Sequence, residues 1–232
     1  MREFGRYRAL AWRGATERVL EVGDGPGLLV LPALFAEANR TRAFTIETLR
    51  RLAGTYRCVL PDLPGTLEST CSLPEVDWSE WCAFAAHAAD DLDTDAVLAI
   101  RGGALLSAGE RPRLHFAPTP GTRLLRDLLR ARMASDREAG TAGTMAKLER
   151  RVANGVESLA GFSMAPQLSQ PLAAAEPVTW AWTIGLADDP GSSDVTIAGT
   201  RLWRRAEPGR DDAMAAGLAT AVIDWRQACD AG

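Results

Sequence analysis

Apolar residues in this chain fall into short continuous runs, which are separated by polar segments that contain glycine and proline. The runs at 28–32, 57–62 and 96–100 lack the alternation of a half-exposed strand, and such runs are typical of strands covered on both faces. Two earlier segments predict an edge hairpin and three later segments predict further strands. In chain order, strands are predicted at 7–13, 18–22, 28–32, 57–62, 96–100, 113–117, 178–182 and 194–198.

The segments between these strands have apolar residues at helical spacing. One helix is predicted over about 41–53 and a closing helix over about 211–228. Another helix begins after Asp77, where Glu80 completes a capping-box pattern three residues later. Because strands and helices alternate, the pattern predicts a mostly parallel sheet flanked by helices and joined by right-handed crossovers.

One long stretch departs from this alternation. Residues 122–171 are predicted to be helical, with a flexible break at 139–143 that is rich in glycine and alanine. A length of 232 residues suits one large domain. We therefore expect a single α/β domain over 1–232 with a helical, cap-like insertion at about 120–175.

Composition narrows the function classes. The net charge of −4 argues against a general nucleic-acid binder. Lys147 is the only lysine and lies in a polar helical stretch, so lysine-based catalysis or phosphate binding has no matching motif. The four cysteines, none at C-x-x-C spacing, are interpreted as core residues of a cytoplasmic protein. No cofactor or metal motif is present, and no apolar run is long enough to form a transmembrane segment.

The run at 96–100 continues into Arg101, Gly102 and Gly103, a turn that predicts a sharp corner followed by a short helix. An α/β-hydrolase holds its nucleophile at such a strand-to-helix corner, in the motif G-x-S-x-G. The same register here is Ala99-x-Arg101-x-Gly103, which places an arginine at the nucleophile position. A guanidinium stays protonated at physiological pH and cannot attack as a serine does.

A serine hydrolase also needs a histidine base and an acid that orients it. His87 and His115 fall within a predicted helix and a predicted strand, and each is interpreted as an ordinary residue satisfied by a neighbour. Ser107 lies a turn beyond the corner, so its hydroxyl is not expected to face the pocket. Trp203 stands in the segment after the last strand, where the histidine is expected. Acidic residues that could serve as the triad acid, but are more simply solvated, are Asp188, Asp189 and Asp194.

Two interpretations of the corner remain open. Arg101 is expected to point into the former active-site pocket, with Glu37 facing the same pocket. In the first interpretation the two form a buried ion pair, because a lone buried charge is costly. In the second, Arg101 and the backbone N–H groups of Gly102 and Gly103 bind a carboxylate or phosphate, such as that of a sugar phosphate or an acidic polysaccharide.

Further candidate residues surround this corner. Asn39 and Arg42 could orient Glu37 or the ligand, or simply cap and solvate a helix. Trp203 could stack on a saccharide, or fill the space of a missing histidine. Five arginines form a basic helical region, which is interpreted as a solvent-exposed face. The alternative is that this region contacts an acidic partner or a membrane surface. Its members are Arg123, Arg126, Arg130, Arg132 and Arg137.

Six motifs resemble those of one known family. Residues 32–42 look like its P-P-F-x-E-E-x-N-x-x-R, and 100–106 look like its L-R-x-G-A-x-L. Weaker matches are 62–66 to the start of D-L-x-G-x-G-x-S, 116–129 to W-x-P-x-x-x-G and its helix, 160–162 to A-G-Y, and 199–203 to G-x-x-F-W. The departures are Ala33, Ala36, Leu67 and Phe116. On these residues the chain resembles the type 2 hydrolases associated with the exosortase A system, α/β-hydrolase-like proteins of exopolysaccharide gene clusters.

The resemblance implies an α/β-hydrolase-like fold and a role beside the exopolysaccharide machinery of Gram-negative bacteria. Without the serine and histidine, we expect a non-catalytic protein that binds an anionic small molecule, a saccharide or a protein partner. One alternative is an atypical hydrolase or transferase that acts on an acyl or glycosyl substrate. The other is a purely structural subunit with a filled pocket. Fold by itself does not decide among them.

Overall fold

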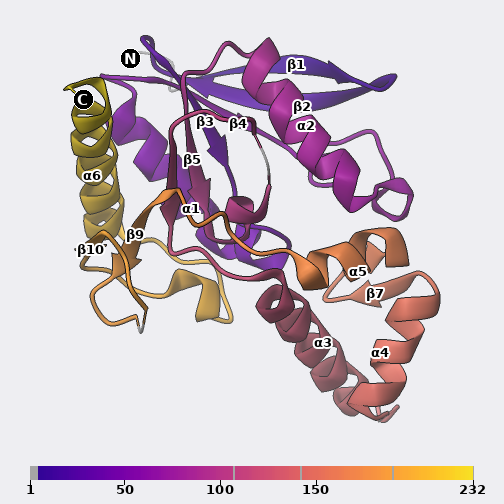
Figure 1. Cartoon of the computed structure of the whole chain (residues 1–232). Coiled ribbons are helices and arrows are strands. Elements are labelled where there is room, and N and C mark those ends of the chain that lie inside the picture. The colour runs from indigo at the N-terminus through magenta and orange to yellow at the C-terminus, as the bar shows by residue number, and fades with distance from the viewer. Residues whose placement is uncertain (1–4, 107, 142, 190, 232) are drawn as a thin grey trace.

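An eight-stranded sheet forms the centre of the computed structural model, which describes residues 5–106, 108–141, 143–189 and 191–231. The strand order is β1-β2-β4-β3-β5-β6-β9-β10 (Figure 1). The first two strands form the predicted edge hairpin, and β2 pairs antiparallel with β4. Every later pair in this order is parallel. The bounds are β1 Arg6–Trp12, β2 Ala15–Val22, β3 Gly27–Leu31, β4 Arg57–Pro61, β5 Ala96–Ile100, β6 Arg113–Phe116, β9 Trp182–Leu186 and β10 Val195–Ile197.

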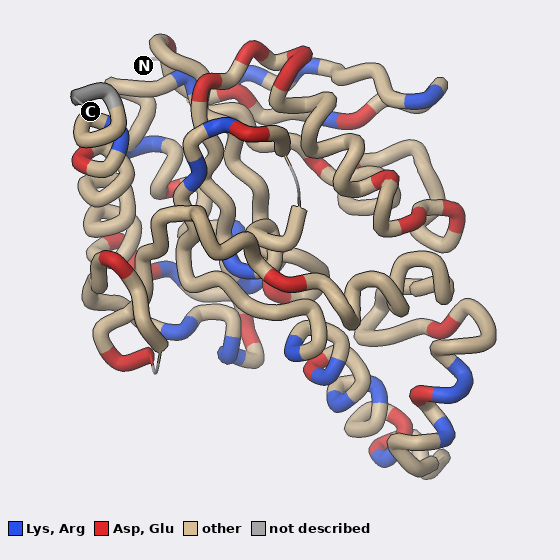
Figure 2. The backbone as a smooth tube through the Cα atoms, in the orientation of Figure 1, with Lys and Arg blue, Asp and Glu red and all other residues tan. Residues whose placement is uncertain are grey.

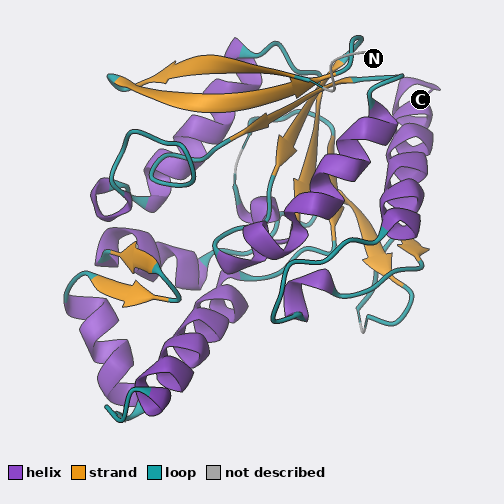
Figure 3. Ribbon diagram, turned by 180° about the vertical axis from the view of Figure 1, so that it is seen from behind, coloured by secondary structure: helices purple, strands orange, loops and turns teal. Residues whose placement is uncertain are grey.

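Helices cover the two faces of this sheet unequally. Helix α1 (Ala36–Leu52) and helix α6 (Asp212–Ala231) lie side by side over one face (Figure 3). Helix α2 (Trp78–Asp91) covers the other face over the early strands, as Figure 1 shows. The mostly parallel sheet flanked by helices is thus confirmed. Helix α1 begins at Ala36, earlier than the predicted start near residue 41.

The cap-like insertion projects from the sheet beyond β6 (Figure 3). It contains α3 (Gly121–Glu138), α4 (Met145–Asn154), β7 (Glu157–Leu159), β8 (Phe162–Met164) and α5 (Pro166–Ala174). Its apolar residues, such as Leu128 and Leu168, belong to the same buried cluster as the residues of α2. The all-helical prediction missed the β7–β8 hairpin, whose turn uses left-handed residues at Ala160 (φ 51°) and Gly161 (φ 88°).

Two connections differ from the prediction in ways that bear on function. The short helix after β5 is a single 3-10 helix, η2 (Arg101–Leu105), and β6 begins soon after it. The late strand predicted at 178–182 begins only at Trp182, because β6 offers pairing partners from Leu114 onward. The segment between α5 and β9 is irregular and runs across the front of the sheet in Figure 1.

Candidate functional site

The corner after β5 is built by close packing. Arg101 adopts a left-handed backbone conformation (φ 52°), which costs a non-glycine residue about 1 kcal/mol or more. A Cβ on Gly103 would lie 2.5 Å from the carbonyl oxygens of Leu31 and Pro32, so glycine is required there. A Cβ on Gly102 would meet the Leu124 side chain at 2.6 Å. The two glycines therefore bring the turn against β3 and α3 and are buried beneath other residues.

Arg101 and Glu37 form the buried ion pair of the first interpretation. Nε of Arg101 donates to Oε2 of Glu37 at 3.1 Å, and Nη2 donates to Oε1 at 3.0 Å. The third nitrogen, Nη1, donates to the carbonyl oxygen of Ala117 at 2.6 Å. Arg101 is 4% exposed and Glu37 8% exposed. Three of the five N–H groups of the guanidinium donate in these bonds, and its Nε–Nη2 edge, which can hold a carboxylate through two parallel bonds, is occupied by Glu37.

Trp203 covers the same guanidinium. It lies in η3 (Leu202–Arg204), after β10, and its ring centre is 4.3 Å from Cζ of Arg101. Its carbonyl oxygen accepts from Nη1 of Arg40 at 3.1 Å, which ties the segment to α1. Phe116 packs edge-on against the indole. This geometry matches the interpretation in which the tryptophan fills the space, since both its neighbours and its buried position leave the ring facing protein.

Three adjacent strands end in left-handed residues at this edge of the sheet. Phe35 (φ 54°), Arg101 (φ 52°) and Ala117 (φ 45°) follow β3, β5 and β6 respectively. Backbone strain of this kind persists only where the surrounding packing fixes it, and it gathers at functional sites. The carboxyl edge of the central strands is therefore the first place to look for a binding site.

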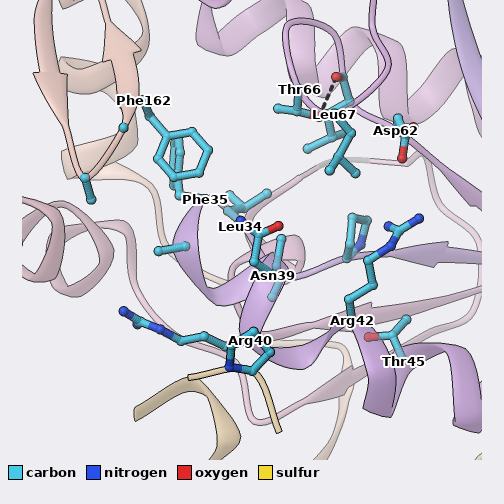
Figure 4. A pocket seen from close by; sticks show the side chains of 18 of the residues that line it. Leu34, Phe35, Asn39, Arg40, Arg42, Thr45, Asp62, Thr66, Leu67 and Phe162 are labelled. Carbon is cyan, nitrogen blue, oxygen red and sulfur yellow. Dashed lines mark hydrogen bonds between the residues drawn. The ribbon is translucent and has the colours of Figure 1, made fainter. Parts of the chain in front are cut away.

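A pocket of about 620 Å³ opens at this edge, next to the Arg101–Glu37 pair. Asn39 and Arg42 line it, whereas the other candidate site residues, Arg101, Gly102, Gly103, Glu37 and Trp203, do not. Sequence reasoning missed most of its walls. They come from the start of α1, the loop after β4, α2 and the β7–β8 hairpin. They include Trp81 and, as Figure 4 shows, Phe35, Asp62, Leu67 and Phe162.

The pocket is apolar on one side and charged on the other. Phe162 of the hairpin meets Phe35 edge-on at 5.5 Å between ring centres, so the insertion forms one wall. Across from them in Figure 4, Arg42 extends toward Asp62. Burial raises the pKa of the Asp62 carboxyl above its ordinary value, while the charge of Arg42 opposes that rise. Arg42 donates no hydrogen bond to another residue within the described ranges.

Comparison with solved structures identifies the architecture. A thioesterase domain from the curacin biosynthetic pathway matches with a TM-score of 0.55 and 13% identity, over 94% of this chain and 99% of that domain. The protein has the α/β-hydrolase fold. No protein-family model matches the sequence, and no curated protein matches it either.

Two further enzymes of this fold match in part. A serine hydrolase involved in carbazole degradation matches at 14% identity with a TM-score of 0.43, over 53% of this chain and 56% of that one. The epoxide hydrolase VrEH1 from Vigna radiata matches at 19% identity with a TM-score of 0.42, over 50% of this chain. The match covers 41% of the epoxide hydrolase, so this chain spans less than half of that enzyme's length.

In an α/β-hydrolase fold the triad acid and histidine follow the nucleophile along the chain. Here the carboxylate of Asp189, after β9, pairs with Nε of Arg201 at 3.0 Å, and the carbonyl of Asp188 accepts from the same guanidinium. Asp194 accepts from the backbone N–H and hydroxyl of Thr183 at 2.7 and 2.8 Å. Two of the three carboxylates predicted to be solvated therefore have partners. Ser107 lies outside the described residues.

The two histidines lie away from this edge and differ from each other. Nε2 of His87 lies 3.0 Å from the carbonyl oxygen of Ala11, so His87 is satisfied by a neighbour as predicted. His115 is fully buried in β6, and neither ring nitrogen has a hydrogen-bond partner. Burial first, and the charge of Arg113 second, lower the pKa of His115 to about 4. The prediction that a neighbour satisfies His115 is wrong, since neither ring nitrogen has a hydrogen-bond partner although Arg113 and Thr183 lie on the same face of the sheet.

The arginines predicted to form a basic helical region lie on α3, where Figure 2 marks basic positions along the backbone of the helix. Arg132 pairs with Asp136 at 2.7 Å, and Arg130 pairs loosely with Asp127 at 3.5 Å. Arg123, Arg126 and Arg137 are exposed. Within the described ranges, no helix has the length and apolar content needed to cross a membrane. No three metal-binding side chains cluster within those ranges either.

Proposed function

We propose that this α/β-hydrolase-fold protein is a non-catalytic binding protein whose ligand occupies the pocket beside the Arg101–Glu37 pair. The observation that carries the proposal is the state of the corner after β5. An arginine whose nitrogens donate to Glu37 and Ala117, and whose face lies against Trp203, supplies neither a nucleophile nor room for an attacking water. As part of this proposal, the protein serves exopolysaccharide production, which is what the sequence resemblance implies.

The pocket favours ligand binding over a purely structural role. Its walls are mainly apolar, with aromatic rings from Phe35, α2 and the hairpin, and its charged and amide side chains are Asn39, Arg40, Arg42 and Asp62. Few polar groups placed in an apolar cavity are typical of small-molecule sites. The arrangement suits a small molecule with an apolar body and a polar, preferably anionic group that Arg42 can meet.

Two measurements test the proposal on the full chain. In the first, a fluorophosphonate probe and a panel of esters and thioesters are offered to the wild type and to Arg101→Ala. We expect neither labelling nor turnover in either protein. Covalent labelling of the wild type, or turnover that Arg101→Ala abolishes, would overturn the non-catalytic assignment in favour of an atypical hydrolase or transferase.

The second measurement tests the pocket with 1-anilinonaphthalene-8-sulfonate, an aromatic anion that fluoresces in apolar sites. We expect saturable binding with one molecule per chain. Ala38→Trp should weaken it at least tenfold, because Ala38 lines the pocket. The matched control is Ala43→Trp on the exposed side of the same helix, which should bind as the wild type does. Binding that is not saturable, or equal binding by both variants, would favour the purely structural subunit.

A further inference from the structure

One half of the sheet has a face that no helix covers within the described residues, although Arg113 and His115 on this face are buried. Helix α2 covers this face over the early strands, but the segment after β5 forms only a short 3-10 helix. The residues of β6, β9 and β10 that point to this side are polar or small, namely Arg113, His115, Thr183, Gly185 and Thr196. Their neighbours on the opposite side, such as Leu114, Ile184 and Leu186, pack in the core with α6. Strands that alternate in this way are typical of a sheet with one packed face.

Arg113 is the unusual member of this face. It is 3% exposed, and it forms no ion pair with any carboxylate in the described ranges. Its Nη1 donates to the carbonyl oxygen of Leu106 at 2.9 Å, but Nε and Nη2 have no hydrogen-bond partner. A buried guanidinium without a counter-charge is strongly unfavourable, and buried charges are normally paired. A bound anion would therefore supply the counter-charge and the hydrogen-bond acceptors that Arg113 lacks.

The free edge of Arg113 has a defined shape. Nε and Nη2 point their N–H groups in parallel, which is the edge that receives the two oxygens of a carboxylate or a phosphate. On Arg101 the same two nitrogens hold the carboxylate of Glu37, so this chain already contains one example of the geometry. The imidazole of His115, two residues along β6, has both nitrogens unpartnered as well.

A second cavity of about 680 Å³ reaches Arg113 from the surface. Trp180, which is 58% exposed, lies in its wall with its ring centre 5.7 Å from Cζ of Arg113. The cavity is also lined by Thr183, Ser192 and Ser193. Asp194 lines it too, and its Oδ2 accepts from the backbone N–H and the hydroxyl of Thr183. An exposed indole beside a buried cation offers a stacking surface for the body of a ligand.

We infer that Arg113 and Trp180 form a second binding site, which takes a carboxylate or phosphate group carried on a small ring-shaped molecule. The oxyanion accepts from Nε and Nη2 of Arg113, and the ring lies against Trp180. Because the free nitrogens lie beneath the surface, the ligand enters beside the half-exposed indole, which turns outward to admit it. This site is on the face of the sheet opposite α6 and is independent of the pocket proposed above.

The test measures binding by isothermal titration calorimetry on the full chain at constant ionic strength. The probes are benzoate and inorganic phosphate, with benzyl alcohol as the neutral match for benzoate. We expect benzoate to bind with one molecule per chain, and benzyl alcohol to bind at least tenfold more weakly. Trp180→Ala should weaken benzoate binding while leaving phosphate binding unchanged, which separates a ring-borne carboxylate from a free phosphate.

Variants of the arginine decide the assignment. Arg113→Met should abolish binding of both anions, and Arg113→Lys, which keeps the charge but lacks the two-pronged edge, should weaken it at least tenfold. Arg111→Met is the matched control, because Arg111 lies two residues away and already pairs with Asp90 at 2.6 Å. If neither anion binds the wild type in the millimolar range, the inference is wrong. It is equally wrong if Arg113→Met and Arg113→Lys bind the anions as the wild type does.

Discussion

The buried Arg101–Glu37 pair makes a sharp energetic prediction. Removing one partner leaves the other as an unpaired buried charge, which typically costs about 3–5 kcal/mol. Arg101→Met also loses the contact with the Trp203 ring, worth roughly 0.5–2 kcal/mol, and leaves the Ala117 carbonyl unpaired. Replacing both charges by apolar side chains removes the unpaired charge altogether. We therefore expect Arg101→Met and Glu37→Met each to cost several kcal/mol, and the double variant to cost far less than their sum.

The assay is a double-mutant cycle in urea, with tryptophan fluorescence and circular dichroism as separate probes of unfolding. The expected coupling energy is about 3 kcal/mol or more, since the two side chains share two hydrogen bonds in a buried site. The control cycle uses Arg130 and Asp127 on α3, which lie 3.5 Å apart with both side chains more than half exposed. Exposed pairs couple by about 0.2–1 kcal/mol at most. Additive costs for Arg101 and Glu37, within about 0.5 kcal/mol, would refute the account of the corner.

Three further predictions concern stability. His115 has a folded pKa of about 4, below the ordinary 6.5, so the unfolded chain takes up its proton first as pH falls. The free energy of unfolding should drop by roughly 2 kcal/mol between pH 7.5 and 5, and His115→Leu should remove that part of the pH dependence in denaturation curves. Gly103→Ala should cost about 3 kcal/mol or prevent folding, whereas Gly54→Ala, with open space around it, should change stability by under about 0.5 kcal/mol. Asp77→Ala should cost about 1 kcal/mol in thermal unfolding, because Asp77 accepts from the N–H of Glu80 at the start of α2.

The central strands could be predicted because burial on both faces leaves an unbroken apolar run in the sequence. The ion pair could be predicted for a related reason, since two charges in a buried corner must find each other. The position of the pocket could not. Its walls come from the loop after β4 and from the β7–β8 hairpin, and each hairpin strand has only three residues, too few to show a period. The turn residues Ala160 and Gly161 were the available signal.

The unpartnered polar side chains of β6, Arg113 and His115, have a signal in the sequence. Arg113-Leu114-His115-Phe116 alternates strictly between polar and apolar residues, which is the pattern of a strand with one packed face. All four residues of β6 are nevertheless buried, so the alternation marks the chemistry of the second face and not its exposure. Alternation in β9, where Thr183 and Gly185 interrupt apolar residues, repeats the same signal.

The contrast between Arg101 and Arg113 separates two uses of a buried arginine. Both lie within the same half of one sheet and both are almost wholly buried, so burial alone cannot distinguish them. Arg101 has a carboxylate on its Nε–Nη2 edge, a carbonyl on its remaining nitrogen and an indole on its face, and these contacts stabilise the corner and leave that edge occupied. Arg113 has the carbonyl and a neighbouring indole but lacks the carboxylate. A carboxylate or phosphate from outside the chain would accept from Arg113 as Glu37 accepts from Arg101. For that reason we place the second binding site at Arg113 on β6, and not at Arg101, which stands at the nucleophile position of the α/β-hydrolase motif.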